Sequence, residues 1–216
     1  MTTHPLPSTI AQVVEHELVI KKSVFLTHLA PVRSVEEAED VIARIRKQRW
    51  DARHHCTALV VGVDADRQRS SDDGEPAGTA GVPMLEVLRR REVTDVVAVV
   101  SRWFGGILLG AGGLVRAYGS AVSETLDLAR PVHRSFLTRV SIEVPHADAG
   151  RITAFLHQWV ATHDAVVDQP TYGAAAVLGV RVAPALVPAF AADLAALSGG
   201  ALAPRIGATE VVDRPA

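Results

Sequence analysis

The sequence predicts an α+β protein of two domains, residues 1–133 and residues 134–216. Three observations support this prediction. Short runs of β-branched and aliphatic residues alternate with segments of helical periodicity, as in an α/β sandwich, over the first domain. Paired glycines at 105–106 and 112–113 suggest a tight connection between a strand and a helix. The C-terminal part follows the order strand, helix, strand, strand, helix, strand.

In the first domain, apolar residues predict two strands, over 11–18 and 23–30, and then a helix. Ser34 and Glu37 match the Ser-x-x-Glu capping box, and apolar residues recur at helical spacing after it. We therefore expect this helix to cover 35–49. Its outer face carries four basic residues, which we interpret as an ordinary solvated face: Arg44, Arg46, Lys47 and Arg49.

A nearly continuous apolar run predicts a buried strand over 56–63, and the polar stretch 64–81 is expected to be one long loop. Long loops in compact domains are more often functional than accidental. A helix over 82–91 and a central strand over 95–102, apolar on both faces, come next. One helical stripe then predicts a second long helix over 114–129.

The second domain is expected to be ferredoxin-like, because its order of elements is that of a split βαβ fold. Alternating residues predict its strands, and apolar residues at helical spacing predict its helices. The six expected elements are strand 136–144, helix 149–162, the hairpin strands 165–172 and 174–182, helix 186–197 and strand 201–212.

Composition excludes several classes of protein. Hydrophobic residues make up 48% of the 216, enough to bury a core without covalent staples. A net charge of −2 argues against a strongly basic nucleic-acid binder and a polybasic membrane anchor. The single cysteine, Cys56, forms no internal disulfide and no zinc site by itself, which fits a reducing compartment. Residues 1–10 lack the features of a signal peptide, and no apolar run approaches the roughly 20 residues that span a bilayer. We therefore expect a cytoplasmic protein without a membrane partner.

Three stretches carry a resemblance to a known family. SDDGEPAGTAG at 71–81 and VVAVVSRWFGGILLGAGGLVRAYG at 96–119 resemble the IMPACT/YigZ family, and DARHHC at 51–56 fits its bacterial YigZ branch. Trp103 and Phe104 stand where the family has an aromatic pair, often two tyrosines. With the C-terminal domain, the resemblance covers almost the whole chain, but it does not extend to the additional N-terminal domain of eukaryotic members.

The resemblance implies a fold and a biological setting. It implies a first domain similar to domain IV of elongation factor G and a second similar to domain V. It also implies a link to translation, because eukaryotic members regulate the kinase pathway that senses amino-acid starvation, largely through protein contacts. The fold transfers to this chain more readily than the partner does.

Nitrogen donors at the entry of the expected strand 56–63 and oxygen donors within the expected loop 64–81 suggest a metal or acid/base cluster. Their spacing matches no established metal signature. Turn chemistry explains the acidic Asp-Asp-Gly-Glu-Pro stretch as well, with carboxylates paired to Arg53, Arg102 or Arg116. We favour this structural interpretation and assign no metal ion, cofactor or catalytic residue. The five cluster residues are His54, His55, Asp72, Asp73 and Glu75.

Thr79, Ser71 and Ser101 are candidate nucleophiles with a neighbouring histidine as base. Thr79 is equally expected to cap the following helix, and Ser101 lies inside an apolar strand. None has the Gly-x-Ser-x-Gly elbow of a hydrolase. Cys56 follows His55 directly, and adjacent strand residues point to opposite faces, which favours a buried structural thiol.

The glycine-rich stretch formed by Gly105, Gly106, Gly112 and Gly113 lacks the Lys-Ser/Thr ending of a P-loop and the dinucleotide-binding spacing. Its helix start can still receive a phosphate through free amides, with Arg102 and Arg116 nearby. The alternative is a packing turn in which residues 107–109 enter the core. Trp103 and Phe104 suit base stacking, or equally a core position.

These patterns favour a non-enzymatic protein that binds RNA, the ribosome or a translation-associated protein. The expected contact surface comprises the loop 72–81, the loop 102–113 and residues 53–55. A hydrolase that uses the His/Asp/Glu cluster is the first alternative. A protein-interaction adaptor that docks through the C-terminal sheet is the second, and an exposed apolar patch there would favour it.

Overall fold

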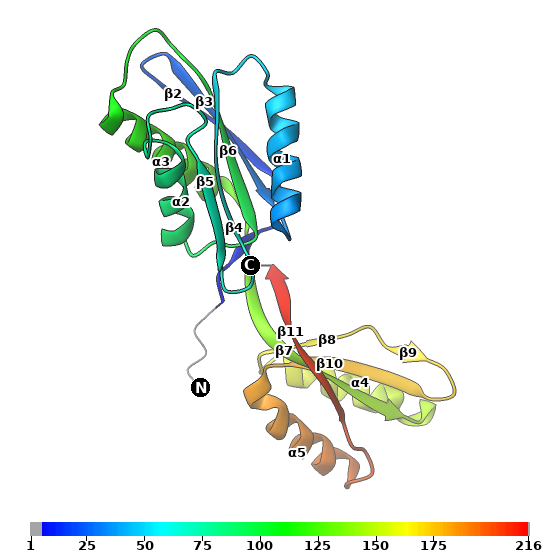
Figure 1. Cartoon of the computed structure of the whole chain (residues 1–216). Helices are drawn as coiled ribbons and strands as arrows, with labels where there is room; N and C mark the ends of the chain where they lie inside the picture. The colour runs from blue at the N-terminus through cyan, green and yellow to red at the C-terminus, as the bar shows by residue number, and fades with distance from the viewer. Residues whose placement is uncertain (1–5, 216) are drawn as a thin grey trace. The chain divides into compact units, whose positions relative to one another are not determined.

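The computed structural model describes residues 6–215, which divide into two compact units (Figure 1). The first unit comprises the chain up to Arg134 together with the residues from Asp213 onward, and the second comprises Ser135–Val212. The expectation about a signal peptide concerns in part residues 1–5, which lie outside the described residues. No described helix is both long enough and apolar enough to cross a bilayer.

The first unit is built on an antiparallel sheet of five strands in the order β2-β3-β6-β4-β5. As its apolar sequence predicts, β6 lies at the centre, between β3 and β4. Lys21 and Lys22 form the turn between β2 and β3, with φ of 45° and 65°, and positive φ at both positions is what a type I′ turn requires. The strands are β2 (Val14–Ile20), β3 (Ser23–Pro31), β4 (His54–Val61), β5 (Arg67–Ser71) and β6 (Val96–Trp103).

Helices cover both faces of this sheet (Figure 1). Successive residues of β6 enter two different cores because side chains alternate along a strand. Ala98 and Val100 pack among residues of α2 and α3, whereas Val97 and Val99 pack against α1. The two cores explain why β6 is apolar without alternation. The helices are α1 (Val35–Gln48), α2 (Gly81–Arg90) and α3 (Ala111–Leu128).

The predicted cap of α1 is present in a modified form. Ser34 Oγ accepts a hydrogen bond from Glu37 N at 3.2 Å, as in a capping box. The Glu37 carboxylate accepts from Arg33 N at 2.7 Å, one residue before the usual donor. The basic outer face is only partly a free solvated surface, because Arg46 and Arg49 form ion pairs with carboxylates elsewhere in the unit.

The prediction of one long loop over 64–81 is wrong. Residues 67–71 form β5, which pairs with β4 in antiparallel register from Val61 opposite Arg67 to Thr57 opposite Ser71. All five residues of β5 are exposed and polar, and the strand lies at the edge of the sheet. An edge strand of this composition has no apolar period, so pattern analysis does not detect it. The predicted loop is therefore divided into a turn at 62–66 and a loop at 72–80.

The second unit contains an antiparallel sheet in the order β11-β7-β10-β8, with a short β9 paired to β10. Its helices and strands share one apolar core, to which Ile142, Ile152 and Phe190 contribute fully buried side chains. The predicted order of elements is present, with β9 and a 3₁₀ turn in addition. Pro131 and Val132, at the start of β7, belong to the first unit and pair there with β1 (Thr9–Ile10). The elements are β7 (Pro131–Val144), α4 (His146–Val160), β8 (Ala165–Val167), β9 (Thr171–Tyr172), β10 (Ala176–Val182), the 3₁₀ turn Pro184–Leu186, α5 (Val187–Ser198) and β11 (Arg205–Pro215).

Candidate functional site

Three connections lie at the same end of the first unit's sheet, where β6 ends and β4 begins (Figure 1). They are the turn 21–22, the segment 49–53 between α1 and β4, and the loop 104–110 between β6 and α3. The strand register places His54 opposite Arg102 at this end. We call the three connections together the loop end.

Gly105 holds two of these connections in contact. A Cβ at this position would lie 2.0 Å from the carbonyl carbon of Lys22, so only glycine lets the two backbones approach. The N–H group of Gly105 donates to Ser23 Oγ at 3.1 Å. The backbone of the 104–110 loop is therefore anchored on the β2–β3 hairpin.

A pocket of about 370 Å³ opens at the loop end on the α3 side of the sheet. Both loops that the sequence singled out contribute to it, the first through residues 74–76 and the second through residues 108–111. The two loops thus share one surface, although the first is shorter than predicted because residues 67–71 form β5. The remaining lining residues are Arg53, His54, Arg102, Phe104 and Leu114.

A buried ion pair forms the floor of the pocket. Arg102 Nη1 donates to Glu75 Oε1 at 2.5 Å, and Tyr118 Oη donates to the same oxygen at 2.9 Å. His54 Nε2 lies 4.0 Å from it. Burial first, and then the proximity of Cys56 and Glu75, raise the pKa of Tyr118 well above its usual range, so its hydroxyl stays protonated and donates. This network joins the loop 72–80 to β6 and α3.

The guanidinium group of Arg102 is held between two aromatic rings. Its Cζ lies 5.3 Å from the ring centroid of Phe25 and 5.8 Å from that of Phe104. The side chain is 7% exposed, and its buried Nε has no hydrogen-bond partner. Arg102 therefore contributes to the pocket wall through its guanidinium group, while its Nε is buried from solvent.

Asp72 has a structural role that the sequence did not predict. Its Oδ1 accepts from the backbone N–H groups of Ala80 at 3.0 Å and Gly81 at 2.8 Å, and its Oδ2 accepts from Gly78 at 2.8 Å. Partial burial favours the neutral acid, but the three hydrogen bonds outweigh it and lower the pKa of Asp72. The carboxylate thus closes the loop and satisfies amides at the start of α2.

Asp73 and the two histidines form a second structural cluster. Asp73 accepts from Arg46 Nη2 at 2.8 Å and from the backbone N–H of His55 at 2.6 Å. His54 Nδ1 donates to the Asp73 carbonyl oxygen at 2.8 Å. The His55 ring lies on the opposite face of β4, hydrogen-bonded to Ser101 Oγ at 3.0 Å. The five residues of the predicted cluster therefore do not converge, and no three metal-ligating side chains come together among the described residues.

The buried ring of His55 predicts a pH dependence of stability. Burial is the main cause that lowers the pKa of His55, and Asp73 only partly opposes it. As pH falls through about 6.5, the unfolded chain takes up a proton that the folded chain resists, so stability falls. The His55→Gln variant should lose less stability than the wild type between pH 7.5 and pH 5.5, measured by urea denaturation. Parallel profiles for the two proteins would contradict this prediction.

Thr79 and Ser101 are both buried, so neither is an accessible nucleophile, although Ser101 Oγ is hydrogen-bonded to the His55 ring. Ser71 is exposed in β5, and its Oγ accepts from the backbone N–H of Asp73 at 3.4 Å.

Thr79 does not cap α2 as expected, because the cap position is Ala80 and Thr79 Oγ1 donates to the Pro76 carbonyl at 2.6 Å. Ser101 is fully buried in β6. Cys56 is also fully buried, and burial raises the pKa of its thiol to about 12, as expected for a structural cysteine.

The hypothesis that residues 107–109 enter the core is wrong for two of the three. Ile107 is 43% exposed and Leu108 is 82% exposed, while Leu109 is partly buried against the core. Phe104 is exposed as well, whereas Trp103 is half-buried and donates through Nε1 to Asp51 Oδ2 at 3.0 Å. Leu108 and its neighbours are thus free to contact a partner.

Trp50 was missed by sequence reasoning. It belongs to the loop end and is 80% exposed, the highest value among the large aromatic side chains. The signal in the sequence was a tryptophan just beyond the basic last turn of a helix. A single exposed apolar side chain is common, so Trp50 matters only together with the other exposed apolar residues of the loop end, Phe104, Ile107 and Leu108.

The start of α3 is one turn earlier than predicted. α3 begins at Ala111, after Gly110 with φ of 70°, and no side chain caps it. Gly112 and Gly113 therefore belong to its first turn, and Arg116 is exposed one turn later. Among the predicted glycines, Gly106 has φ of 85°, which favours glycine for backbone reasons alone.

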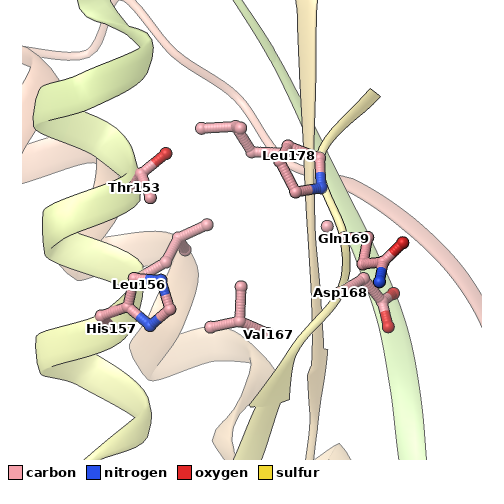
Figure 2. A pocket seen from close by; sticks show the side chains of 9 residues that line it. Thr153, Leu156, His157, Val167, Asp168, Gln169 and Leu178 are labelled. Carbon is pink, nitrogen blue, oxygen red and sulfur yellow. The ribbon is translucent and has the colours of Figure 1, made fainter. Parts of the chain in front are cut away.

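A second cavity, of about 320 Å³, lies in the second unit between α4 and the strands β8 and β10 (Figure 2). Thr153 and His157 of α4 lie opposite Leu178 of β10 across it. Asp168, which also lines it, pairs with Arg181 at 2.9 Å. None of its lining residues belongs to the predicted contact surface.

Comparisons with known proteins place this geometry in a family. The family model of the Impact N-terminal domain matches residues 21–126. IMPACT family member YigZ of Escherichia coli (strain K12) is 41% identical over 199 residues, covering 91% of this chain and 94% of YigZ. The chain belongs to the IMPACT family. The resemblance that its motifs predicted is therefore confirmed.

Other IMPACT relatives extend the comparison. IMPACT family member YvyE of Bacillus subtilis (strain 168) is 49% identical over 144 residues, which are 67% of this chain and 66% of YvyE. A solved structure, described as a crystal structure of a hypothetical protein, is 38% identical and has a TM-score of 0.61 over 96% of this chain and 99% of that one. Every residue that lines the loop-end pocket lies within the stretch matched by the Impact N-terminal domain.

Proposed function

We propose that this IMPACT-family protein regulates translation in the cytoplasm by binding RNA, free or within the ribosome, at the loop end. It catalyses no reaction in this proposal. Membership of the family supports the link to translation, which the motif resemblance implies through the eukaryotic members. The choice of RNA as partner depends on the chemistry of the loop end.

The observation that carries the proposal is the gathering of free cations and exposed apolar side chains at the loop end. Single-stranded nucleic acid is bound by positive charge that follows the phosphates and by aromatic rings on which bases stack. Both kinds of group are present here, and none of these cations has an ion-pair partner among the described residues. The cations are Lys21, Lys22 and Arg53, and the apolar groups are Trp50, Phe104, Ile107 and Leu108.

The net charge of −2 does not oppose this proposal, because the carboxylates nearest the pocket are already neutralised. Glu75 pairs with Arg102, and Asp73 pairs with Arg46. Within the loop end, Lys21, Lys22 and Arg53 outnumber the one carboxylate without an ion pair among the described residues, that of Asp51, so the local charge is positive. A local basic surface is sufficient for phosphate contacts.

The topology supports the finer fold resemblance that the family implies. In the second unit, the order β11-β7-β10-β8 with two helices in one core is that of a ferredoxin-like fold. We propose that this unit corresponds to domain V of elongation factor G and the first unit to domain IV. A relationship to a translation factor fits a protein that meets ribosomal RNA.

The hydrolase alternative has less support. Its catalytic groups were expected to converge in a concave site, but Asp72 and Asp73 are occupied by structural hydrogen bonds and His55 faces the opposite side of the sheet. Only His54 and Glu75 of the five line the pocket. Two groups with no candidate nucleophile among the lining residues of the pocket do not make a hydrolytic site.

The adaptor alternative predicts an exposed apolar patch on the sheet of the second unit. Charged residues interrupt that sheet: Arg139 lies opposite Arg181, and both approach Asp168. Val177, beside Glu143, is exposed in the same sheet. Other exposed apolar residues in its strands are Phe136, Val166, Tyr172 and Ile206. This mixture of charged and apolar side chains supports the adaptor alternative less than the groups at the loop end support RNA binding.

Binding of the protein to ribosomes and to structured RNA across a salt series tests the proposal. Phosphate contacts should make the logarithm of the binding constant fall linearly with the logarithm of salt concentration. Replacing Lys21 and Lys22 with glutamine should weaken binding and reduce the slope by about 2, because each phosphate contact contributes about one unit.

A matched control carries the same charge change elsewhere. Arg89 and Arg90 are exposed in the last turn of α2, and replacing both with glutamine should leave the slope unchanged. Absence of RNA and ribosome binding even at low salt would remove the proposal. Binding to ribosomes without a salt slope would indicate a ribosome-associated protein as the partner.

A further inference from the structure

The loop-end pocket has an aromatic wall that can take a planar ring. Phe104 lines it and is 43% exposed. The guanidinium group of Arg102 lies 5.8 Å from the centroid of this ring, so it covers one face. Leu108, which is 82% exposed, lines the pocket on the same loop. A flat ligand can therefore stack on the free face of Phe104 with Leu108 beside it.

The same pocket has groups that bind a phosphate. Arg53 lines it, is exposed and has no ion-pair partner among the described residues. Gly110 and Ala111, at the start of α3, line it too. Leu114 N donates to Gly110 O at 2.9 Å, so the N–H groups of residues 111–113 have no partner within the helix. An uncapped helix start beside a guanidinium group is a phosphate-binding arrangement.

One carboxylate oxygen on the pocket floor is left for a ligand. Oε1 of Glu75 takes the contacts from Arg102, Tyr118 and His54, which leaves Oε2 for another donor. The Nε of Arg102 is buried from solvent, so it offers no donor to a ligand. The pocket floor thus has an acceptor for an N–H group on the edge of a nucleobase. Because Glu75 neutralises Arg102, the free positive charge is that of Arg53.

We infer that this pocket binds one unstacked purine nucleotide. The base stacks on Phe104 beside Leu108 and donates an N–H group to Glu75, while the phosphate contacts Arg53 and the first turn of α3. A volume of about 370 Å³ is in the range of small-ligand sites, and a purine offers the larger stacking surface. The inference deepens the proposed function, on which it rests for the source of the nucleotide, an exposed residue of single-stranded RNA.

Calorimetric titration of the full-length chain with AMP tests the pocket. Adenosine lacks the phosphate and ribose 5-phosphate lacks the base, so each should bind at least about tenfold more weakly than AMP. Inorganic phosphate should bind more weakly still. Equal binding of AMP and ribose 5-phosphate would overturn the inference, because the base would then make no contact.

Two exposed positions allow variants that leave the fold intact. Phe104→Ala should weaken AMP binding about tenfold or more by removing the stacking surface. Arg53→Gln should weaken AMP binding about tenfold and leave adenosine binding unchanged. Phe136→Ala is the matched control, since this phenylalanine is 42% exposed in the second unit. An equal loss in Phe104→Ala and Phe136→Ala would overturn the inference.

A single-stranded oligoadenylate separates this inference from the proposed function. If AMP competes with the oligonucleotide and Phe104→Ala loses binding of both ligands, the pocket inference and the RNA proposal are both supported. AMP binding without binding of the oligonucleotide, structured RNA or ribosomes supports the pocket as a site for a free nucleotide and overturns the RNA proposal. Oligonucleotide binding that AMP does not displace and that Phe104→Ala does not change overturns the pocket while the RNA proposal stands.

Discussion

Replacing Glu75 with alanine is expected to lower the free energy of unfolding of the first unit by about 3–5 kcal/mol. The change leaves Arg102, which is 7% exposed, without its ion-pair partner. It also leaves the Tyr118 hydroxyl without an acceptor, and this hydroxyl cannot lose its proton because its pKa is raised. A buried charge and a buried donor without partners are among the largest single-residue penalties. Urea denaturation followed by circular dichroism measures the loss.

A surface ion pair provides the matched control for Glu75. Glu39 pairs with Arg69 at 2.9 Å, but their side chains are 61% and 65% exposed. The Glu39→Ala variant should therefore lose no more than about 1 kcal/mol, because solvent screens such a pair. Adding Arg102→Met to Glu75→Ala should recover part of the lost stability, since the unpaired charge is then absent. Equal losses in the two alanine variants would show that burial of the pair does not matter.

Replacing Asp72 with alanine is the second large effect, with an expected loss of about 2–3 kcal/mol. Three backbone N–H groups, of Gly78, Ala80 and Gly81, lose their acceptor at once. Hydrogen bonds to a charged group contribute about 1.5–3 kcal/mol each, but the half-buried position of Asp72 and access of water reduce the total. The measurement is again urea denaturation of the full chain.

The Asp72 effect should depend on pH in a defined direction. The pKa of Asp72 is lowered in the folded protein, so its contribution is fully present above the unfolded value of about 4 and disappears as pH falls through the folded value. The difference between wild type and Asp72→Ala should therefore shrink on acidification. Asp40→Ala is the control, because Asp40 is exposed on α1 and its loss should change stability by less than about 0.5 kcal/mol at every pH. A difference that is constant down to pH 2 would show that the charge of Asp72 contributes nothing.

Elements with a strong local signal could be read from the chain. The apolar run that forms β6 and the capping box before α1 are complete within a few residues, and both predictions are correct apart from one or two residues at the ends. By contrast, β5 has no apolar residue at all, and only its pairing with β4 makes it a strand. The prediction that Thr79 caps α2 is also wrong. The carboxylate that accepts from the first amides of this helix belongs to Asp72, eight residues before Ala80, where a local pattern does not look for it.

In the candidate site, too, some features could be predicted from the sequence and others depend on the tertiary structure. The residues that line the pocket could be named as candidates, because the two conspicuous loops contain Glu75, Arg102 and Phe104. Which carboxylate stabilises a helix, which pairs with Arg102 and which binds Arg46 could not be predicted. The two ion pairs join segments far apart in the sequence, and the hydrogen bonds of Asp72 depend on the conformation of the loop 72–80. The exposure of Leu108 and Trp50 likewise depends on where the loops leave the sheet.

Composition, periodicity and motif alone thus established the α+β class, the central strand and the family of this chain, since each of these is encoded by residues close together in sequence. The partners of Asp72, Asp73, Glu75 and His55, and the meeting of two loops in one pocket, were determined by folding. The physical reason is that hydrogen bonds and ion pairs act over a few ångströms. For Asp73, Glu75 and His55, the neighbours at that range are set by the pairing of β4, β5 and β6, which no local pattern specifies. For Asp72, they are set by the conformation of the loop 72–80.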